Sequence, residues 1–409
     1  MSITQAVFYG TGNNAEQNLQ KWFGSGIVPA CFVDADTHKH YTQFHGYDVL
    51  PLDEALLRFP DSDIYITLAN RNLLSATKHL LSNGVKQENI KYFEDVAYGK
   101  GCWQLEGHMH CTAFLKPCSH WHYSASDCIE LTGDFKANYN SYVDTINRLK
   151  QNLLSDKPCG CSGCSEVKIG LWSKTFKPRL FALHDDIKGE RCNCRCIYCD
   201  LTKSGGHIRN GKYTAPEILN SLGGYFPAKT MFYYAPAELT VSPHKKEIYA
   251  YLRDRDWEFS VVKTSGIAFD AELAEFVSHG GRVNVSLDSG TKETYAKVKG
   301  VDCFDKVVAN LEKYKAVGAK IELKYILLEN LNDSEADFDG FMDIAQKLSG
   351  QIILTVDMNT LQTGIPESMW TSLTLFAEKI KNYVLPVRLH SEHLSNENYE
   401  RLSKLVCSN

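Results

Sequence analysis

The stretch RCNCRCIYCD (Arg191–Asp200) decides how this chain is interpreted, because Cys192, Cys196 and Cys199 follow the spacing C-x3-C-x2-C. Thiolates on one short loop can each bind a different iron of a [4Fe–4S] cube, and three ligands leave the fourth iron open. Four cysteines within this stretch are also compatible with half of a zinc site or a redox dithiol. Cys194 lies outside the spacing and is interpreted as a spare thiol. The stretch therefore predicts an iron–sulfur site with an open iron.

The same motif, with an aromatic residue before its last cysteine, resembles the signature of the radical SAM superfamily. Cys192, Cys196, Tyr198 and Cys199 match that signature. The resemblance implies that the open iron binds S-adenosylmethionine and that an electron from the cluster cleaves it to a 5'-deoxyadenosyl radical. It also implies an external electron donor such as flavodoxin or ferredoxin.

Composition indicates a water-soluble protein of two or three domains. The chain has 409 residues, of which 44% are hydrophobic and 23% charged, and no long apolar run predicts a membrane span. The N-terminus shows no secretion signal, so we expect a cytoplasmic protein. A net charge of −5 without a concentrated basic stripe argues against nucleic acid as the main partner.

Cysteine usage indicates metal binding. The chain has 14 cysteines, and a cytoplasmic protein keeps them reduced, so clustered cysteines predict metal sites and not disulfides. Most lie between Cys102 and Cys199, whereas Cys31, Cys303 and Cys407 stand apart and are interpreted as packing or surface residues.

Residues 1–98 alternate strands and helices, which predicts a small parallel sheet. A strand over residues 5–9 leads into Gly10-Thr-Gly12 and then a helix, the context in which glycines permit a tight turn and helix amides face an anion. A second strand ends at Asp34, whose carboxylate could meet a ribose hydroxyl. The segment resembles the Rossmann-like domains of surface-sugar enzymes, which implies a nucleotide or nucleotide-sugar ligand. A scaffold without a ligand remains an alternative.

Residues 99–177 form a cysteine-rich segment that ends in Cys159-Gly-Cys161-Ser-Gly-Cys164 after a helix expected over residues 142–154. It resembles the SPASM and twitch auxiliary-cluster modules, although here it precedes the core. A closed cluster needs four cysteines, so we expect these three as ligands of an auxiliary [4Fe–4S] cluster, completed by Cys118 or Cys102. Neighbouring histidines keep a structural zinc site open as an alternative. The other cysteines and the histidines of this segment are Cys111, Cys128, His108, His110, His120 and His122.

Residues 178–395 predict an α/β core in which six strands alternate with six helices as a partial (β/α)6 barrel of the TIM type. Residues 396–409 are expected to be a short C-terminal tail. The expected strands cover residues 179–184, 230–234, 258–263, 282–287, 320–327 and 352–356. The expected helices cover residues 216–222, 245–253, 271–279, 303–317, 336–348 and 368–383.

The ends of these strands carry further matches to the radical SAM superfamily. Glu238 takes the place of the acid that binds the amino group of S-adenosylmethionine, although the family's glycines are missing before it. Ser286 and Asp288 match the family's Ser-Leu-Asp, and Lys324 is the candidate for the cofactor's carboxylate. Each also has a structural interpretation: Glu238 as an acid at a helix start, Ser286 and Asp288 as turn caps, Lys324 as a solvated charge.

The last strand ends at Asp357-Met-Asn359, which the cofactor motifs do not explain, so Asp357 and Asn359 are predicted to face the substrate. We therefore expect an enzyme that abstracts a hydrogen atom from a polar small molecule, with sugars or nucleotide-sugars favoured and an auxiliary cluster in electron transfer. Two alternatives stay open. One is modification of a peptide, and the other is a non-catalytic iron–sulfur or zinc protein that senses redox state.

Overall fold

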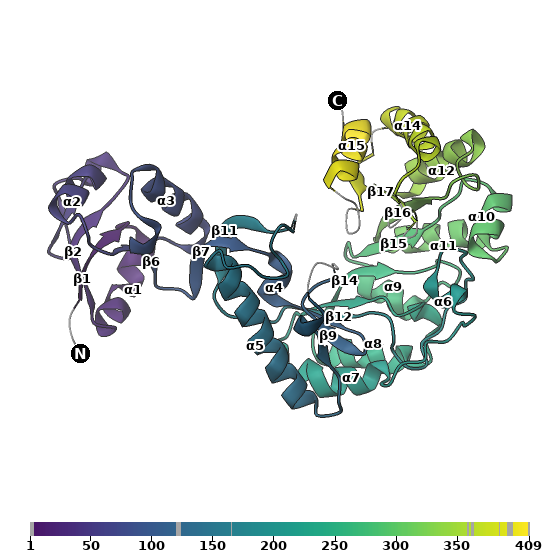
Figure 1. Ribbon diagram of the computed structural model, residues 1–409, viewed down its shortest axis with the longest axis horizontal. Helices are drawn as coiled ribbons and strands as arrows, with labels where there is room; N and C mark the ends of the chain where they lie inside the picture. The colour runs from purple at the N-terminus through teal and green to yellow at the C-terminus, as the bar shows by residue number, and fades with distance from the viewer. Residues whose placement is uncertain are drawn as a thin grey trace. The chain divides into compact units, whose positions relative to one another are not determined.

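A computed structural model describes residues 4–119, 124–164, 166–357, 360, 364–383, 385–390 and 396–407 (Figure 1). The chain divides into two compact units, residues 1–106 with 146–177, and residues 107–145 with 178–409. Helices α4 (Trp103–Gly107) and α5 (Phe135–Leu154) contribute residues to both. In the part of the chain that is described, no helix is both long and apolar enough to cross a bilayer.

The first unit contains a six-stranded sheet in the order β3-β4-β2-β1-β5-β6. All of its neighbouring strands are parallel except β3 and β4. The strands are β1 (Thr4–Tyr9), β2 (Ile27–Val33), β3 (Gln43–Phe44), β4 (Tyr47–Leu50), β5 (Ile64–Ile66) and β6 (Ile90–Tyr92). The helices are α1 (Asn13–Gly24), α2 (Leu52–Arg58) and α3 (Asn70–Ser82).

Alternation along β1 builds the two cores of this sheet, because successive side chains of a strand point to opposite faces. Val7 and Tyr9 belong to one core with side chains of α2 and α3. Ala6 and Phe8 belong to the other core with side chains of α1, among them Trp22. The helices therefore cover both faces of the sheet, as Figure 1 shows, and the predicted small parallel sheet is confirmed.

A separate antiparallel pair, β7 (Val96–Gly101) and β11 (Lys168–Ser173), completes the first unit. A Cβ at Gly101 would lie 2.3 Å from the Trp172 ring, so only glycine lets the indole lie across β7 here. Helix α5 begins at Phe135, seven residues before its expected start, and ends at the expected Leu154. This antiparallel pair holds the two ends of the cysteine-rich segment side by side.

The second unit contains a ten-stranded sheet in the order β10-β9-β8-β12-β13-β14-β15-β16-β17-β18. From β8 to β18 every neighbouring pair is parallel. The strands are β8 (His108–Cys111), β9 (Phe114–Lys116), β10 (Ile129–Glu130), β12 (Leu180–Leu183), β13 (Met231–Tyr234), β14 (Glu258–Lys263), β15 (Arg282–Ser286), β16 (Lys320–Leu327), β17 (Gln351–Val356) and β18 (Val387–Leu389).

The helices of the second unit lie between successive parallel strands along the chain, as a β/α architecture requires, except for α15, which follows the last strand. They are α6 (Asp200–Lys203), α7 (Ala215–Leu222), α8 (Lys245–Asp254), α9 (Ala271–Val277), α10 (Lys292–Lys299), α11 (Phe304–Ala316), α12 (Glu335–Leu348), α14 (Glu367–Lys381) and α15 (Asn396–Cys407). The predicted α/β class and the alternating strands and helices are confirmed. Among the described strands, β10 and β18 do not pair with each other, so the curved sheet is open.

The sequence did not predict β8, β9, β10 or α10. Strand β8 pairs with β12 and so extends the parallel sheet by a strand from the cysteine-rich segment. Helix α10 has ordinary signals at both ends, since the Thr291 hydroxyl caps its start and Gly300 ends it in the left-handed conformation. These signals lie between the expected strand at residues 282–287 and the expected helix at residues 303–317, where no element was predicted.

Candidate functional site

The Cys192–Cys199 loop lies at the carboxyl ends of the parallel strands, between β12 and α6. Cys192, Cys196 and Cys199 line one cavity of about 360 Å³, a volume typical of sites for small molecules. The loop's amide groups are fixed from outside, because Arg195 N–H donates to the Lys299 carbonyl (2.8 Å) and Ile197 N–H to the Val298 carbonyl (3.1 Å). The last turn of α10 therefore holds the backbone of the cysteine loop.

Lys299, whose carbonyl accepts one of these hydrogen bonds, also forms a buried ion pair. Lys299 and Asp288 form a salt bridge with side chains 4% and 0% exposed, respectively. The Tyr198 hydroxyl donates to Asp288 (2.6 Å), and Lys299 Nζ donates to the Tyr198 oxygen (2.7 Å). Burial by itself lowers the pKa of Lys299, but the Asp288 carboxylate more than offsets this and the pKa is raised. The Lys299 ammonium group is therefore a fixed positive charge next to the cysteine loop.

Asp288 is held in an unusual backbone conformation, with a φ of 55°. Its carboxylate accepts the Ile326 N–H (2.7 Å), and its carbonyl accepts the side-chain amide of Asn332 (2.7 Å). Backbone strain of this kind persists only where the surroundings over-determine it. Asp288 is not among the residues that line the cavity. The structure therefore places it as a support of Tyr198 and Lys299, and its predicted contact with the cofactor stays a prediction.

Two of the three motif thiols, Cys192 and Cys196, have lowered pKa values, whereas burial raises the pKa of Cys199. Hydrogen bonding from Cys194, and then the charge of Lys299, outweigh burial and lower the pKa of Cys196 to about 6. Cys194 also lowers the pKa of Cys192. The thiolate is the form of cysteine that binds iron. Cys194, predicted to be a spare thiol, donates its backbone N–H to Cys192 Sγ (3.4 Å), and its side chain influences the pKa values of both Cys192 and Cys196.

The three motif cysteines have the donors and the sequence spacing of a cluster site with one open iron. Cys192, Cys196 and Cys199 line the same cavity. Thiolates on one short loop can each bind a different iron of a [4Fe–4S] cube, and three ligands leave the fourth iron open. The donor set therefore fits a [4Fe–4S] cluster.

The predicted cofactor contacts gather around this cavity. Tyr198, Glu238, Ser286 and Lys324 all line it. The Glu238 carboxylate is 3% exposed and accepts the hydroxyl groups of Thr240 (2.6 Å) and Thr264 (2.8 Å), together with backbone amides. It also caps the short 3-10 helix Leu239–Val241, so its structural interpretation holds as well. The network fixes the direction of the carboxylate at the cavity wall.

Sequence reasoning missed several residues of the site. Lys299 had a detectable signal, because it falls one turn after Tyr295 on the buried face of α10, where a charge requires a buried partner. Arg209 had none. It lines the cavity and joins distant segments by donating to Asp200 (2.7 Å) and Asp185 (2.7 Å). Lys263 also lines the cavity, at the end of β14.

Of the two residues predicted to face the substrate, one is not part of the cavity lining and the other lies outside the described residues. Asp357 follows β17 directly and accepts the Thr360 N–H (3.4 Å). It is not among the residues that line the cavity. Asn359 lies outside the described residues. Their catalytic role stays a prediction.

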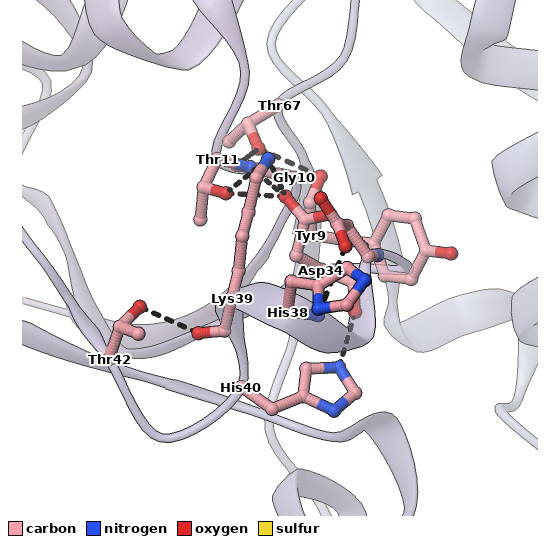
Figure 2. Close-up of polar contacts among 10 residues, drawn as sticks. Tyr9, Gly10, Thr11, Asp34, His38, Lys39, His40, Thr42 and Thr67 are labelled. Atoms are coloured by element: carbon pink, nitrogen blue, oxygen red, sulfur yellow. Dashed lines mark hydrogen bonds and ion pairs between the residues drawn. The ribbon is translucent and has the colours of Figure 1, made fainter.

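In the first unit, the glycine turn after β1 meets the carboxylate at the end of β2 (Figure 2). A Cβ at Gly10, whose φ is 116°, would lie 2.5 Å from the Leu68 side chain, so a glycine is required. Gly12 precedes α1, and nothing lies within 4 Å of a Cβ built there. The turn therefore has the strand, glycine and helix context that the sequence predicted.

Asp34 is engaged by groups of the protein itself. Its carboxylate accepts the Thr11 N–H (2.9 Å), the Thr11 hydroxyl, the Asp36 N–H (2.9 Å) and Lys39 Nζ (3.1 Å). Burial raises the pKa of Asp34, but these hydrogen bonds outweigh it and lower the pKa to about 2. A ribose hydroxyl would have to share or replace these donors, and nucleotide binding through Gly10, Gly12 and Asp34 stays a prediction.

The predicted auxiliary ligands divide between the two units. Cys102, Cys159, Cys161 and Cys164 belong to the first unit, whereas Cys118 belongs to the second. Every cysteine whose side chain is described is a free thiol. The choice between Cys102 and Cys118, left open by the sequence, stays a prediction.

A curved parallel β/α sheet with a three-cysteine loop at its carboxyl edge is the arrangement of one class of iron–sulfur protein. Comparison with known proteins gives the family to which this part of the chain is similar. Residues 187–342 match the family model described as the Radical SAM superfamily. Residues 187–342 therefore form a radical SAM domain, and the resemblance of the Cys192–Cys199 motif to that superfamily is confirmed. The expected cofactors, a [4Fe–4S] cluster and S-adenosylmethionine, are those of this superfamily.

Individual relatives match only in part. GTP 3',8-cyclase of Clostridium acetobutylicum is 25% identical over 169 residues, which are 40% of this chain and 52% of that protein. GTP 3',8-cyclase of Paenarthrobacter nicotinovorans is 28% identical over 154 residues, 36% of this chain and 43% of that protein. The crystal structure of Streptococcus suis SuiB bound to precursor peptide SuiA is 14% identical, covers 62% of this chain and 54% of that chain, and has a TM-score of 0.42. This chain thus spans about half the length of the curated relatives that it matches.

Proposed function

We propose that this chain is an enzyme that reductively cleaves S-adenosylmethionine and abstracts a hydrogen atom from a polar small molecule. One observation carries the proposal: the three motif cysteines share a single cavity with Glu238 and Lys324. An iron–sulfur protein that only senses redox state has no need for a carboxylate and an ammonium group facing its cluster loop. A cofactor with both an amino and a carboxyl group needs both.

The residues of the cavity have separate tasks in this proposal. When bound, the cluster supplies the electron that cleaves the sulfonium of S-adenosylmethionine, which is chemistry that belongs to the cofactors. The Glu238 carboxylate accepts hydrogen bonds from the cofactor's amino group, and the Lys324 ammonium pairs with its carboxylate. Ser286 offers a hydroxyl to the ribose or the carboxylate. The side chains of Leu201 and Ile326 add apolar wall that excludes water.

Charge and relatives together favour a small anionic substrate. Lys263 and Arg209 also line the cavity, which leaves cationic groups beyond the one assigned to the cofactor. The relatives named GTP 3',8-cyclase act, by that name, on a nucleotide. We therefore propose a sugar, nucleotide-sugar or related phosphorylated metabolite as the substrate class. Electrons would come from a donor such as flavodoxin or ferredoxin, and a cytoplasmic location follows from the need for reduced thiols.

The first test is formation of 5'-deoxyadenosine. After anaerobic reconstitution and dithionite reduction, the protein should convert S-adenosylmethionine to this product, which is measured by liquid chromatography with mass spectrometry. Glu238→Gln should lower the rate at least tenfold and raise the cofactor concentration for half-maximal rate. Glu258→Gln, at the exposed start of β14, is the matched control and should leave both unchanged. A protein with a full cluster at the motif and no product would refute the proposal.

The second test concerns the substrate. Deuterium on the reacting carbon should appear in 5'-deoxyadenosine when deuterated sugars or nucleotide-sugars are supplied. Transfer from deuterated peptides, and not from sugars, would refute the small-molecule part while leaving the radical chemistry intact.

A further inference from the structure

We propose that a row of polar side chains next to the cofactor cavity binds a phosphate group of the substrate. The row consists of His184, Tyr233 and Lys263, and His110 is a positioning residue behind His184. The inference deepens the proposed function, on which the identity of the phosphate as part of the substrate rests. All four residues belong to the second unit and lie at or near the carboxyl ends of β8, β12, β13 and β14. Ligands of parallel β/α sheets bind at this edge.

Strand register places Lys263 and Tyr233 on the face of the sheet that lines the cofactor cavity. Residues that pair in register point to the same face, and so do residues two positions apart on one strand. Lys263 lines the cavity and pairs with Asn284, which also lines it. Tyr233 pairs with Val261, two positions before Lys263. The polar face of the cavity therefore continues from β14 onto β13.

The same face continues over β12 and β8. Tyr233 pairs with Ala182, which pairs in turn with His110 of β8. His184 lies two positions after Ala182, and its N–H donates to the Cys111 carbonyl (2.8 Å), which carries the pairing of β12 with β8 one residue further. Neighbouring strands lie about 4.8 Å apart, so the row from His184 to Lys263 is about 10 Å long. A row of this length can contact a phosphate group and the neighbouring hydroxyl groups of one sugar.

Contacts between the side chains hold the row together. His110 Nδ1 and His184 Nε2 are 2.8 Å apart, so one imidazole donates a hydrogen bond to the other. The centres of the His184 and Tyr233 rings are 5.4 Å apart, and Lys263 Nζ lies 5.0 Å from the centre of the same Tyr233 ring. The face of an aromatic ring attracts a cation. Tyr233 therefore lies between an imidazole and an ammonium group and contacts both.

The exposure of the row separates the residues that contact the ligand from the one that supports them. His110 is 5% exposed, whereas His184, Tyr233 and Lys263 are half-buried and reach the surface of this face. When His110 donates through Nδ1, neutral His184 accepts at Nε2 and carries its own proton on Nδ1. His110 thereby makes His184 Nδ1 a hydrogen-bond donor.

The charge of the row fits an anion. The Lys263 ammonium donates charge-assisted hydrogen bonds, which phosphate oxygens accept, and the imidazole N–H and phenol hydroxyl add neutral donors. The carboxylate next to the row, Asp185, already accepts a hydrogen bond from the Arg209 guanidinium (2.7 Å). Its negative charge is therefore compensated by a cation outside the row.

The test measures phosphate binding by the reconstituted full-length protein. Inorganic phosphate is titrated by calorimetry with S-adenosylmethionine absent and at saturation, and we expect a Kd on the order of 1 mM in both arms. Lys263→Met removes a charged donor and should weaken binding about tenfold. His184→Ala removes a neutral donor and should weaken it about fivefold. Lys246→Met, exposed on α8 of the same unit, is the matched control and should bind phosphate as the wild type does.

His110 needs a separate test, because its side chain is buried and does not contact the phosphate. His110→Ala should weaken phosphate binding about fivefold, whereas His110→Gln, whose amide can donate to His184, should restore most of the affinity. Circular dichroism checks that both variants are folded. A folded His110→Ala variant with the affinity of the wild type would refute the positioning role.

Each remaining outcome also decides the proposal. Unchanged affinity in Lys263→Met, or loss of binding on Lys39→Met in the first unit, would overturn the assignment. Displacement of phosphate by S-adenosylmethionine would show that the row belongs to the cofactor, and a wild type that binds no phosphate would refute the site. The readout needs no cleavage of S-adenosylmethionine. A protein that binds phosphate at the row and forms no 5'-deoxyadenosine would refute the proposed function and leave the phosphate site standing.

Discussion

The two cysteine regions rest on similar supports, a buried lysine paired with a carboxylate, but the two supports differ in burial. In the second unit, Lys299 and Asp288 are 4% and 0% exposed beneath the Cys192–Cys199 loop. In the first unit, Lys150 (4% exposed) pairs with Glu106 (13% exposed), four residues after Cys102. Glu106 also accepts the hydroxyl of Ser173 (2.9 Å), so it keeps a partner without the lysine.

The loops also differ in what fixes their backbones. The Cys192–Cys199 loop donates amide hydrogen bonds to the carbonyls of Val298 and Lys299, which belong to another element. The hydrogen bonds that shape the Cys159–Cys164 turn run between residues of the turn and Val167. The difference teaches that a neighbouring helix fixes the backbone of the Cys192–Cys199 loop, whereas these hydrogen bonds of the Cys159–Cys164 turn are local.

Breaking the Lys299–Asp288 ion pair should have the largest effect on stability. Lys299→Met leaves the Asp288 charge buried without its cation, and we expect a loss of about 3 to 5 kcal/mol in the free energy of opening. Hydrogen exchange should show this loss in β15 and β16 and not in β7 and β11. Lys297→Met, on the exposed side of the same helix, is the control. Adding Asp288→Asn should restore part of the loss, and a double variant as unstable as the single one would contradict the explanation.

Breaking the Lys150–Glu106 ion pair should have a smaller effect on stability, confined to the first unit. Lys150→Met should cost about 2 to 3 kcal/mol, because Glu106 retains Ser173 and some solvent. The loss should appear as faster hydrogen exchange in β7 and β11, with β15 and β16 unchanged. Lys136→Met, exposed on the same helix α5, should change neither. Equal losses in both units would show that the two supports are not independent.

A third prediction tests the external fixing of the Cys192–Cys199 loop. Gly300 has a φ of 65°, and a Cβ there would lie 2.8 Å from the Arg195 carbonyl oxygen. Gly300→Ala should therefore cost about 1 to 3 kcal/mol and lower the iron retained by the loop. Gly205→Ala is the matched control, since its φ is 74° but nothing lies within 4 Å of the added carbon. It should cost only about 1 kcal/mol and leave the iron unchanged.

The smallest effect should come from a third lysine–carboxylate pair, Lys39 with Asp34, which is more exposed than the two above, with side chains 40% and 12% exposed. The pKa of Asp34 is lowered to about 2, below its value in an unfolded chain. Its contribution, on the order of 1 to 2 kcal/mol, is therefore present above about pH 4 and lost as the pH falls toward 2. Hydrogen exchange in β1 and β2 should show Asp34→Asn less stable than wild type at pH 7. A difference that persists unchanged at pH 2 would contradict this explanation.

Much of the fold was predictable because its signals are local. The strands at β14 and β16 were predicted with their observed ends, since hydrophobic periodicity and flanking turn residues mark them. Strand β8 could not be predicted, because its four residues are buried only through pairing with β12, far along the chain. The cavity residues Glu238, Ser286 and Lys324 were predicted through their match to the motifs of the superfamily. Arg209 was not, because its three partners come from separate segments.

By itself the sequence determined the spacing of Cys192, Cys196 and Cys199, the alternation of strands and helices, and hence the superfamily, because these depend on neighbours along the chain. Only the tertiary structure decided that Asp288 lies beneath Tyr198 and not in the cavity, and that Cys102 shares a unit with the Cys159–Cys164 turn. Those placements follow from strand register and from the burial of charges that must be paired, and both are settled only when distant segments pack together.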